Sequence, residues 1–359
     1  MRTGVSLEDL KGPVSVRGVV NIIRGGRVMR TDVPVSGMKL EWSKTRDVPG
    51  QLTYDAPEDW TPIEPLSPLN FYGQRSEAWV VYTTTDGVDH PVHLGQFIHT
   101  GWASSEGKVS VTAADLFQVL EEDPMMWPSS PKTGATVRDE LQRLAGTIPV
   151  VLDTGVPNAP VPRTAQWGTS RLGAIKSLAG ANGFDVRMEA DACLHAFPIR
   201  DARYTDAIYT MDDLLINAPR MMPTTRRPNR WYAVGTKTDS TTDKSGESVQ
   251  VERKWSATAT NTEDPFAPSE YGWVTQRVEA SSADSQNSVS SVLNAQMATD
   301  LSSLTSRSVE IVPDGRIEVG DILGFVTDEE TFAGRVIAYT LPVSDVGSAM
   351  RVDIEELEW

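Results

Sequence analysis

The sequence Arg46-Asp-Val-Pro-Gly-Gln-Leu-Thr-Tyr-Asp-Ala-Pro57, followed by Pro68-Leu-Asn-Phe-Tyr-Gly-Gln-Arg75, has the pattern of a strand, a detour and a return to the next strand. Leu52 and Tyr54 alternate with polar residues, as in a half-buried strand. Four prolines occupy the detour, and proline cannot donate a ladder hydrogen bond. We therefore predict a loop over residues 57–68.

Short strands extend on both sides of this stretch. Arg24-Gly-Gly-Arg27 supplies a two-glycine hairpin turn, because glycine reaches positive φ without steric cost. Alternating apolar residues predict strands around it, over residues 14–22, 38–43, 77–83, 93–99 and 108–112. Strands at this spacing are typical of a closed or nearly closed barrel, so we predict an N-terminal β-barrel over residues 1–113.

The spacing of apolar residues changes after residue 113 and predicts a small α+β domain over residues 114–206. Val137, Leu141 and Leu144 share one helix face, with Thr136 as N-cap and Gly146 as the end. A second helix is predicted to begin at Ser170. Two strands, 184–188 and 193–197, are predicted to form a hairpin.

The chain returns to β patterns from residue 207. We predict paired strands at 231–237 and 249–260, a solvated mobile loop at 238–248, and a long helix at 284–304. That helix is rich in serine, so it requires packing on a neighbouring element. A third region, 207–310, and a small C-terminal β domain, 311–359, complete a mainly β, multi-domain fold with an α+β insertion.

Composition limits the classes of function. The 359 residues carry a formal charge of −16, whereas a duplex-DNA-binding protein neutralises phosphates with lysine and arginine. The acidity is concentrated in residues 310–358, which hold twelve acidic residues and three arginines. A single cysteine, Cys193, excludes an intramolecular disulfide. We see no signal peptide and no membrane span, so we expect a soluble protein made in a cytoplasm, without membrane insertion.

No set of residues assembles into a catalytic motif. Gly168-Thr-Ser-Arg-Leu-Gly173 approaches a nucleophile elbow, but its second glycine is one residue late, so Ser170 is interpreted as a helix N-cap. His90 and His93 have the spacing of some ligand pairs, and Cys193 and His195 would share a strand face. A structural zinc site needs four ligands. We therefore expect no enzyme activity, no cofactor and no metal.

Two features suggest contacts with partners. A basic segment interrupts the acidic chain; it fits either an ordinary inter-domain linker or a surface that docks on an acidic partner. Exposed aromatic residues are also favoured at interfaces. The resulting candidate interface residues are Arg220, Arg226, Arg227, Arg230 and Trp359.

Several further motifs accompany the opening stretch along nearly the whole chain. They are Trp127-Pro-Ser-Ser130, Arg138-Asp-Glu-Leu-Gln-Arg-Leu-Ala-Gly146, Asp213-Leu-Leu-Ile-Asn-Ala-Pro-Arg220, Pro228-Asn-Arg-Trp-Tyr-Ala-Val-Gly235, Ser306-Arg-Ser-Val-Glu310, Arg316-Ile-Glu-Val-Gly-Asp321 and Gly334-Arg-Val-Ile-Ala-Tyr-Thr-Leu-Pro342. Together they resemble the tail-hub or minor tail proteins of siphophages of actinobacteria, relatives of the baseplate hub of contractile phages.

The resemblance implies a structural protein of the virion tail tip, assembled in the host cytoplasm. Two related hub-type barrels, the second over residues 207–310, would let a homotrimeric ring match a sixfold tube to a threefold tip. The implied partners are the distal tail protein, the tape-measure protein and other tail-tip proteins. DNA would pass through the lumen without specific binding, helped by acidic walls.

Two other functions remain open at this stage. A cell-wall hydrolase would place its carboxylates among the acids of residues 114–206. A carbohydrate-binding protein would instead use exposed tryptophans against the polysaccharide of the host surface.

Overall fold

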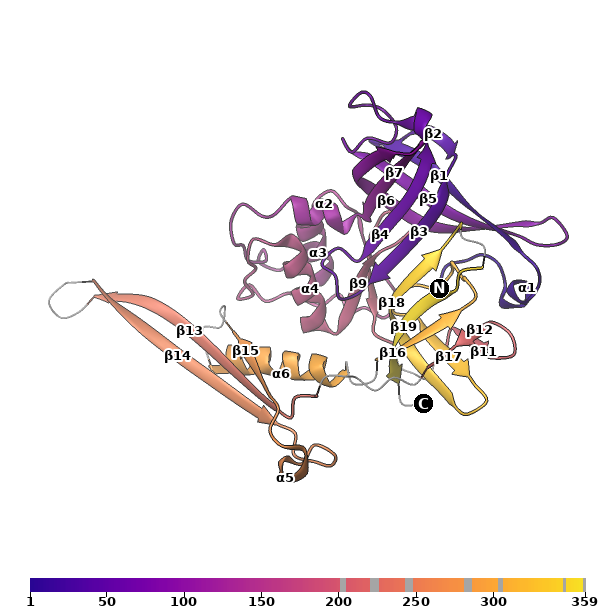
Figure 1. The fold of residues 1–359 in the computed structure, drawn as a ribbon. Helices are drawn as coiled ribbons and strands as arrows, with labels where there is room; N and C mark the ends of the chain where they lie inside the picture. Colours follow the sequence, from indigo (N-terminus) through magenta and orange to yellow (C-terminus); the bar gives the residue numbers. More distant parts are fainter. Residues whose placement is uncertain are drawn as a thin grey trace. The chain divides into compact units, whose positions relative to one another are not determined.

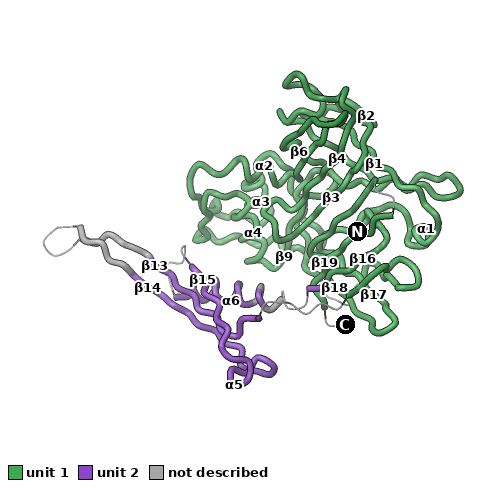
Figure 2. The backbone as a smooth tube through the Cα atoms, in the orientation of Figure 1, with its two compact units in different colours: residues 1–219, 308–359 green, residues 220–307 purple. Residues whose placement is uncertain are grey.

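The computed structural model describes residues 1–200, 205–219, 226–242, 248–280, 286–302, 306–344 and 347–357. Backbone contacts divide the chain into two compact units (Figure 2). Unit 1 contains Met1–Pro219 and Ser308–Trp359, and unit 2 contains Arg220–Arg307. The mainly β fold class predicted from the sequence is confirmed in both units. Among the described residues, no helix combines the length and apolar character needed to cross a bilayer.

The N-terminal half of unit 1 is a run of seven antiparallel neighbours in one sheet (Figure 1). Their order is β3-β4-β7-β6-β5-β1-β2, and Gly25 and Gly26 form the β1–β2 turn at positive φ, as predicted. A short helix, α1 (Leu7–Lys11), precedes them, and the proline-rich detour contains the 3-10 turn Glu58–Trp60. The strands are β1 (Ser15–Arg24), β2 (Arg27–Val33), β3 (Ser36–Ser43), β4 (Gly50–Pro57), β5 (Gln74–Thr83), β6 (Asp89–Ser105) and β7 (Lys108–Asp115).

The C-terminal strands continue this same sheet. β18 (Thr331–Pro342) pairs with β19 (Met350–Leu357) on one side and with β3 on the other. β19 is followed in the sheet by β16 (Ser306–Ile311) and β12 (Leu215–Asn217). The branch formed by β17 (Ile322–Val326) and β11 (Ala207–Thr210) pairs with β18. Strands from residues 15–115, 207–217 and 306–357 thus belong to one thirteen-stranded sheet.

A second, smaller layer of unit 1 holds the α+β segment. Its sheet has the order β8-β10-β9, with β8 parallel to β10 and β9 antiparallel. Thr136 caps α3 in a capping box and Ser170 caps α4, as the sequence predicts. The elements are α2 (Phe117–Glu122), α3 (Val137–Ala145), β8 (Val150–Leu152), α4 (Arg171–Asn182), β9 (Phe184–Met188) and β10 (Leu194–Pro198).

Unit 2 is a three-stranded sheet with one long helix. The strand order is β14-β13-β15, and the core gathers Trp231, Ala233, Ala280, Val289 and Leu293. Helix contacts with β13 and β14 supply the packing that the serine-rich sequence requires. The elements are β13 (Arg230–Thr242), β14 (Ser248–Thr260), α5 (Pro268–Tyr271), β15 (Thr275–Glu279) and α6 (Gln286–Ser302).

These units differ from the four domains expected from the sequence. Residues 1–113, 114–206 and 311–359 belong to one unit with one continuous apolar core, because β3 hydrogen-bonds to β18 and the segments share buried side chains. Residues 207–219 also join unit 1, through β11 and β12. Within the segment predicted as a loop at 238–248, β13 runs to Thr242 and β14 starts at Ser248, so that part of the prediction is wrong; residues 243–247 lie outside the described residues.

A buried polar chain anchors the proline-rich detour. His99 on β6 is 3% exposed, and its Nδ1–H donates to the carbonyl of Asn70 at 2.9 Å. Its Nε2 must then accept from the hydroxyl of Ser76 at 2.8 Å, which in turn lies 2.8 Å from the hydroxyl of Tyr54. Burial lowers the pKa of His99 from its ordinary value to about 4, although the backbone contacts of the ring oppose the shift.

We predict that His99 makes unit 1 acid-sensitive. The folded pKa of His99 lies below the unfolded value of about 6.5. The stabilisation of the folded state by neutral His99 is therefore complete above pH 6.5, and it is lost as pH falls toward 4. That loss corresponds to about 3 kcal/mol of unfolding free energy. Urea unfolding at pH 7 and pH 4 should show a smaller acid-induced loss for H99Q than for wild type. The H90Q variant is the control, and an equal loss in H99Q and wild type would contradict the prediction.

Candidate functional site: a basic–aromatic cluster in unit 2

Three of the predicted interface arginines lie beside aromatic rings in unit 2. The Arg226 guanidinium lies 4.7 Å from the ring centroid of Tyr271 and donates to the carbonyl of that residue. Arg230 lies 4.7 Å from the ring centroid of Trp273. We call Arg226, Arg230, Tyr271 and Trp273 the basic–aromatic cluster. The backbone N–H of Arg227 donates to the Tyr271 hydroxyl at 2.8 Å and so fixes the ring.

The cluster has the chemistry of a docking surface. Trp273 is 48% exposed, and Arg226 is exposed as well. Stacked guanidinium groups keep their charge available while their flat faces cover apolar rings. Such a surface suits a partner that offers carboxylates together with apolar contact. Arg220 and Trp359, the other two predicted interface residues, lie outside the described residues.

Asn229 organises the cluster, and the sequence analysis did not single it out. This side chain is fully buried. Its amide donates at 2.9 Å to the carbonyls of Phe266 and Gly272, and its oxygen accepts from the Val274 N–H at 2.8 Å. The segment that carries the arginines is thereby joined to the segment that carries the rings. An Asn-Arg-Trp sequence alone gives no sign of these partners, which follow about 40 residues later.

Unit 1 exposes apolar side chains in two loops. Met126 and Trp127 are 86% and 77% exposed in the loop before α3. The proline-rich detour exposes Ile63 at 91% and Leu66 at 57%. Exposed large apolar residues gathered in loops indicate contact surfaces.

The acidic C-terminal region is less exposed than its composition suggests. Asp314 is fully buried and accepts from Arg316 and from the Tyr209 hydroxyl at 2.8 Å. Glu318, 8% exposed, lies 3.6 Å from Arg2. These carboxylates balance arginines inside the fold. They contribute little to the outer negative field, which therefore depends on exposed acids such as those at 328 and 329.

The two histidine-containing pairs that the sequence analysis weighed as metal ligands, and did not predict to bind metal, have different environments. His93 stacks on Trp79 with ring centroids 4.0 Å apart. Burial lowers its pKa, although Glu77 opposes the shift. Cys193 lies just before β10, with its Sγ 3.8 Å from the Asp191 carbonyl.

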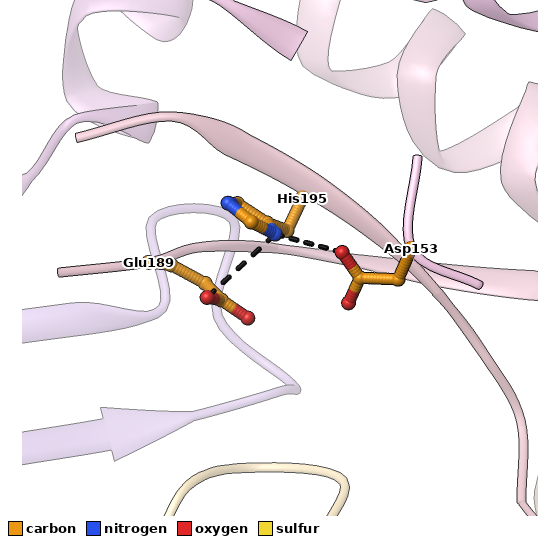
Figure 3. Close-up of side chains that lie close together, drawn as sticks. All are labelled: Asp153, Glu189 and His195. Atoms are coloured by element: carbon orange, nitrogen blue, oxygen red, sulfur yellow. Dashed lines mark hydrogen bonds and ion pairs between the residues drawn. The ribbon is translucent and has the colours of Figure 1, made fainter. Parts of the chain in front are cut away.

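The His195 ring lies against three carboxylates. Asp191 is 3.1 Å from Nε2, and Asp153 and Glu189 lie near Nδ1 (Figure 3). The sequence analysis missed these two residues, because they lie 42 and 6 positions away in other segments and match no ligand motif.

Comparison with known proteins shows the fold but no close relative. No protein-family model matches the sequence, and no curated protein matches it. Among solved structures, a tail protein from Neisseria meningitidis MC58 aligns with a TM-score of 0.63 and 12% identity, over 94% of this chain and 96% of its own. The 43 kDa tail protein of prophage MuSo2 from Shewanella oneidensis aligns with a TM-score of 0.62 and 10% identity, over 94% and 98%.

A third structure agrees with these two. The prophage tail protein gp18 from Listeria monocytogenes EGD-e has a TM-score of 0.52 and 12% identity, with 94% of each chain covered. This chain therefore has the fold of phage tail proteins along nearly its whole length, as the sequence resemblance predicted.

We predict that Asn229 is essential to the stability of unit 2. N229A removes three hydrogen bonds and leaves two carbonyls and one N–H without their partner, which costs about 2–3 kcal/mol of unfolding free energy. In the full-length protein, urea unfolding should show this loss of free energy, and limited proteolysis should show faster cleavage within residues 220–307. N294A, at an exposed position of α6, is the matched control and should change the free energy by less than about 0.5 kcal/mol. Equal stability of the two variants would contradict the prediction.

Proposed function

We propose that this protein is a structural subunit of a siphophage tail-tip hub, in which three copies form a ring that closes the tail tube. The observation that carries this proposal is the shared fold, which covers 94% of this chain and at least 94% of each of three phage tail proteins. A likeness that includes both compact units favours the same kind of role. The ring would adapt a sixfold tube to a threefold tip, as a virion component assembled in the host cytoplasm.

Charge complementarity supports self-association. The basic–aromatic cluster is a local positive surface on a chain whose net charge is −16. A second copy of the chain is itself an acidic partner, so the cluster of one copy can pair with carboxylates of the next. Repetition of one such heterologous contact closes a ring when the rotation fits. The exposed apolar loops at 126–127 and 63–66 would add contacts to other subunits, to the distal tail protein or to other tail-tip proteins.

The proposed ring would have a lumen that the tape-measure protein fills and DNA later crosses. A net negative wall repels phosphate and keeps DNA from binding. Because Asp314 and Glu318 are buried and paired with arginines, this repulsion would have to come from exposed acids. In this role the protein holds position and symmetry and performs no catalysis.

We predict a trimer in solution. Light scattering after gel filtration should give three times the chain mass of 39.3 kDa, and negative-stain images of that peak should show rings with a central hole. A monomer at all concentrations tested, with no ring in the images, would contradict the trimer. Fluorescence quenching by host polysaccharide in that case would favour the carbohydrate-binding alternative.

We predict that the basic–aromatic cluster contributes to this assembly. R226E reverses a charge within the cluster and should weaken self-association at least tenfold, measured by the concentration dependence of the mass. R277E is the matched control, because it makes the same charge reversal at an exposed arginine of β15 outside the cluster. It should change the association less than twofold. Equal effects of the two variants would show that only net charge matters.

A further inference from the structure

We propose that Asp153, Glu189 and His195 form a binding site for a divalent transition-metal ion of the zinc class. The three residues come from different segments of the small sheet in unit 1 (Figure 3). Asp153 follows the end of β8, Glu189 lies in the turn after β9, and His195 lies on β10. Their ligand atoms all lie within 4.8 Å of one another.

The distances suit coordination by one imidazole nitrogen and two carboxylate oxygens. The His195 Nδ1 lies 2.8 Å from the Asp153 Oδ1 and 3.6 Å from the Glu189 Oε2. Ligands of a tetrahedral zinc ion, each about 2.0–2.2 Å from the metal, lie about 3.4 Å apart. The Glu189 Oε2, 3.6 Å from the His195 Nδ1, already satisfies this spacing to the imidazole. The Asp153 oxygen needs to move by about 0.6 Å, which a side-chain rotation at the end of β8 can provide.

The neighbours of the ligands hold them in the required orientation. The His195 Nε2 lies 3.1 Å from the Asp191 Oδ2, and donation of Nε2–H to this carboxylate leaves the Nδ1 lone pair for a metal. An imidazole whose other nitrogen donates to a carboxylate is the usual arrangement of a metal-bound histidine. Arg187 donates to the Glu189 Oε1 at 3.0 and 2.7 Å, so the other oxygen of Glu189 faces His195.

The local charge also favours a cation. Three carboxylates, those of Asp153, Glu189 and Asp191, surround one imidazole. Arg187 offsets one of them, but it also lies 3.5 Å from Glu318 and shares its charge. A protonated His195 supplies one positive charge, whereas a divalent ion supplies two. The metal therefore compensates the partly buried carboxylates more completely than the imidazolium can.

The donor set selects the class of ion. Calcium and magnesium prefer oxygen ligands alone, whereas imidazole together with carboxylate suits zinc and its neighbours in the first transition series. Three protein ligands leave at least one coordination position for water or for another ligand. A bound ion would join the end of β8, the β9–β10 turn and β10, so its structural effect would be to stiffen this sheet.

Zinc binding to the full-length protein tests the proposal. Protein stripped with a chelator is dialysed against zinc chloride, and bound zinc is measured by elemental analysis. Wild type should retain one zinc per chain, and its melting temperature should rise by about 5 °C at a zinc concentration 100-fold above the dissociation constant. H195A should lose at least tenfold in affinity, which reduces the thermal shift at the same zinc concentration to about half or less. H90A, which removes a histidine outside the cluster, should behave as wild type.

Conservative variants keep the test valid if H195A folds poorly. E189Q preserves the shape of the side chain and its contact with Arg187, and D153N preserves the length of Asp153. Each should weaken zinc binding at least tenfold while the circular dichroism spectrum stays that of wild type. Wild-type affinity in E189Q and D153N, or no zinc bound by wild type, would overturn the proposal. In the second outcome the cluster is an ion-paired histidine only.

Discussion

The pairing of β3 with β18 is the constraint on which the architecture of unit 1 depends. Five residues of β18 align with five of β3, with Leu341 opposite Leu40, and both of those side chains are buried. Without β18, the edge of β3 would expose a row of unpaired backbone donors and acceptors. The chain departs after β12, forms unit 2, and must return in register for β18 to fill this edge. The N-terminal and C-terminal segments therefore make one core.

Buried polar side chains hold the loops of unit 1 that have no strand partner. His99 holds the proline-rich detour through the carbonyl of Asn70. Glu140 on α3 accepts from Trp167 at 2.6 Å and from Arg143 at 2.7 Å. Burial raises the pKa of Glu140, but these two donors outweigh it and hold the pKa below its ordinary value. In each case a side chain satisfies a distant partner that water cannot reach, so the loop has one arrangement.

Charge in this protein is arranged in two ways. Carboxylates such as Asp314 are buried against arginines, whereas Arg226 and Arg230 lie on aromatic rings at the surface of unit 2. Net charge therefore describes the surface poorly, because part of the acidity is neutralised inside the fold. What remains outside is an acidic surface with a local basic–aromatic cluster, the combination on which the proposed association between copies rests. The site formed by Asp153, Glu189 and His195 follows neither arrangement, because its carboxylates outnumber the cations beside them.

The sequence by itself determined the local elements. Periodicity and caps predicted the α3 and α4 starts at Thr136 and Ser170, the hairpin turn at Gly25 and Gly26, and the strand 184–188, because these depend on neighbours a few residues away. Only the tertiary structure decided that 311–359 completes the N-terminal sheet, that Asn229 binds residues beyond position 265, and that Asp153 meets His195. Those contacts join segments that are distant in the chain. The local sequence around a strand edge or a carboxylate does not identify which distant segment it will contact. Burial and backbone pairing across the whole unit determine which segments come together, and no short window of sequence contains that information.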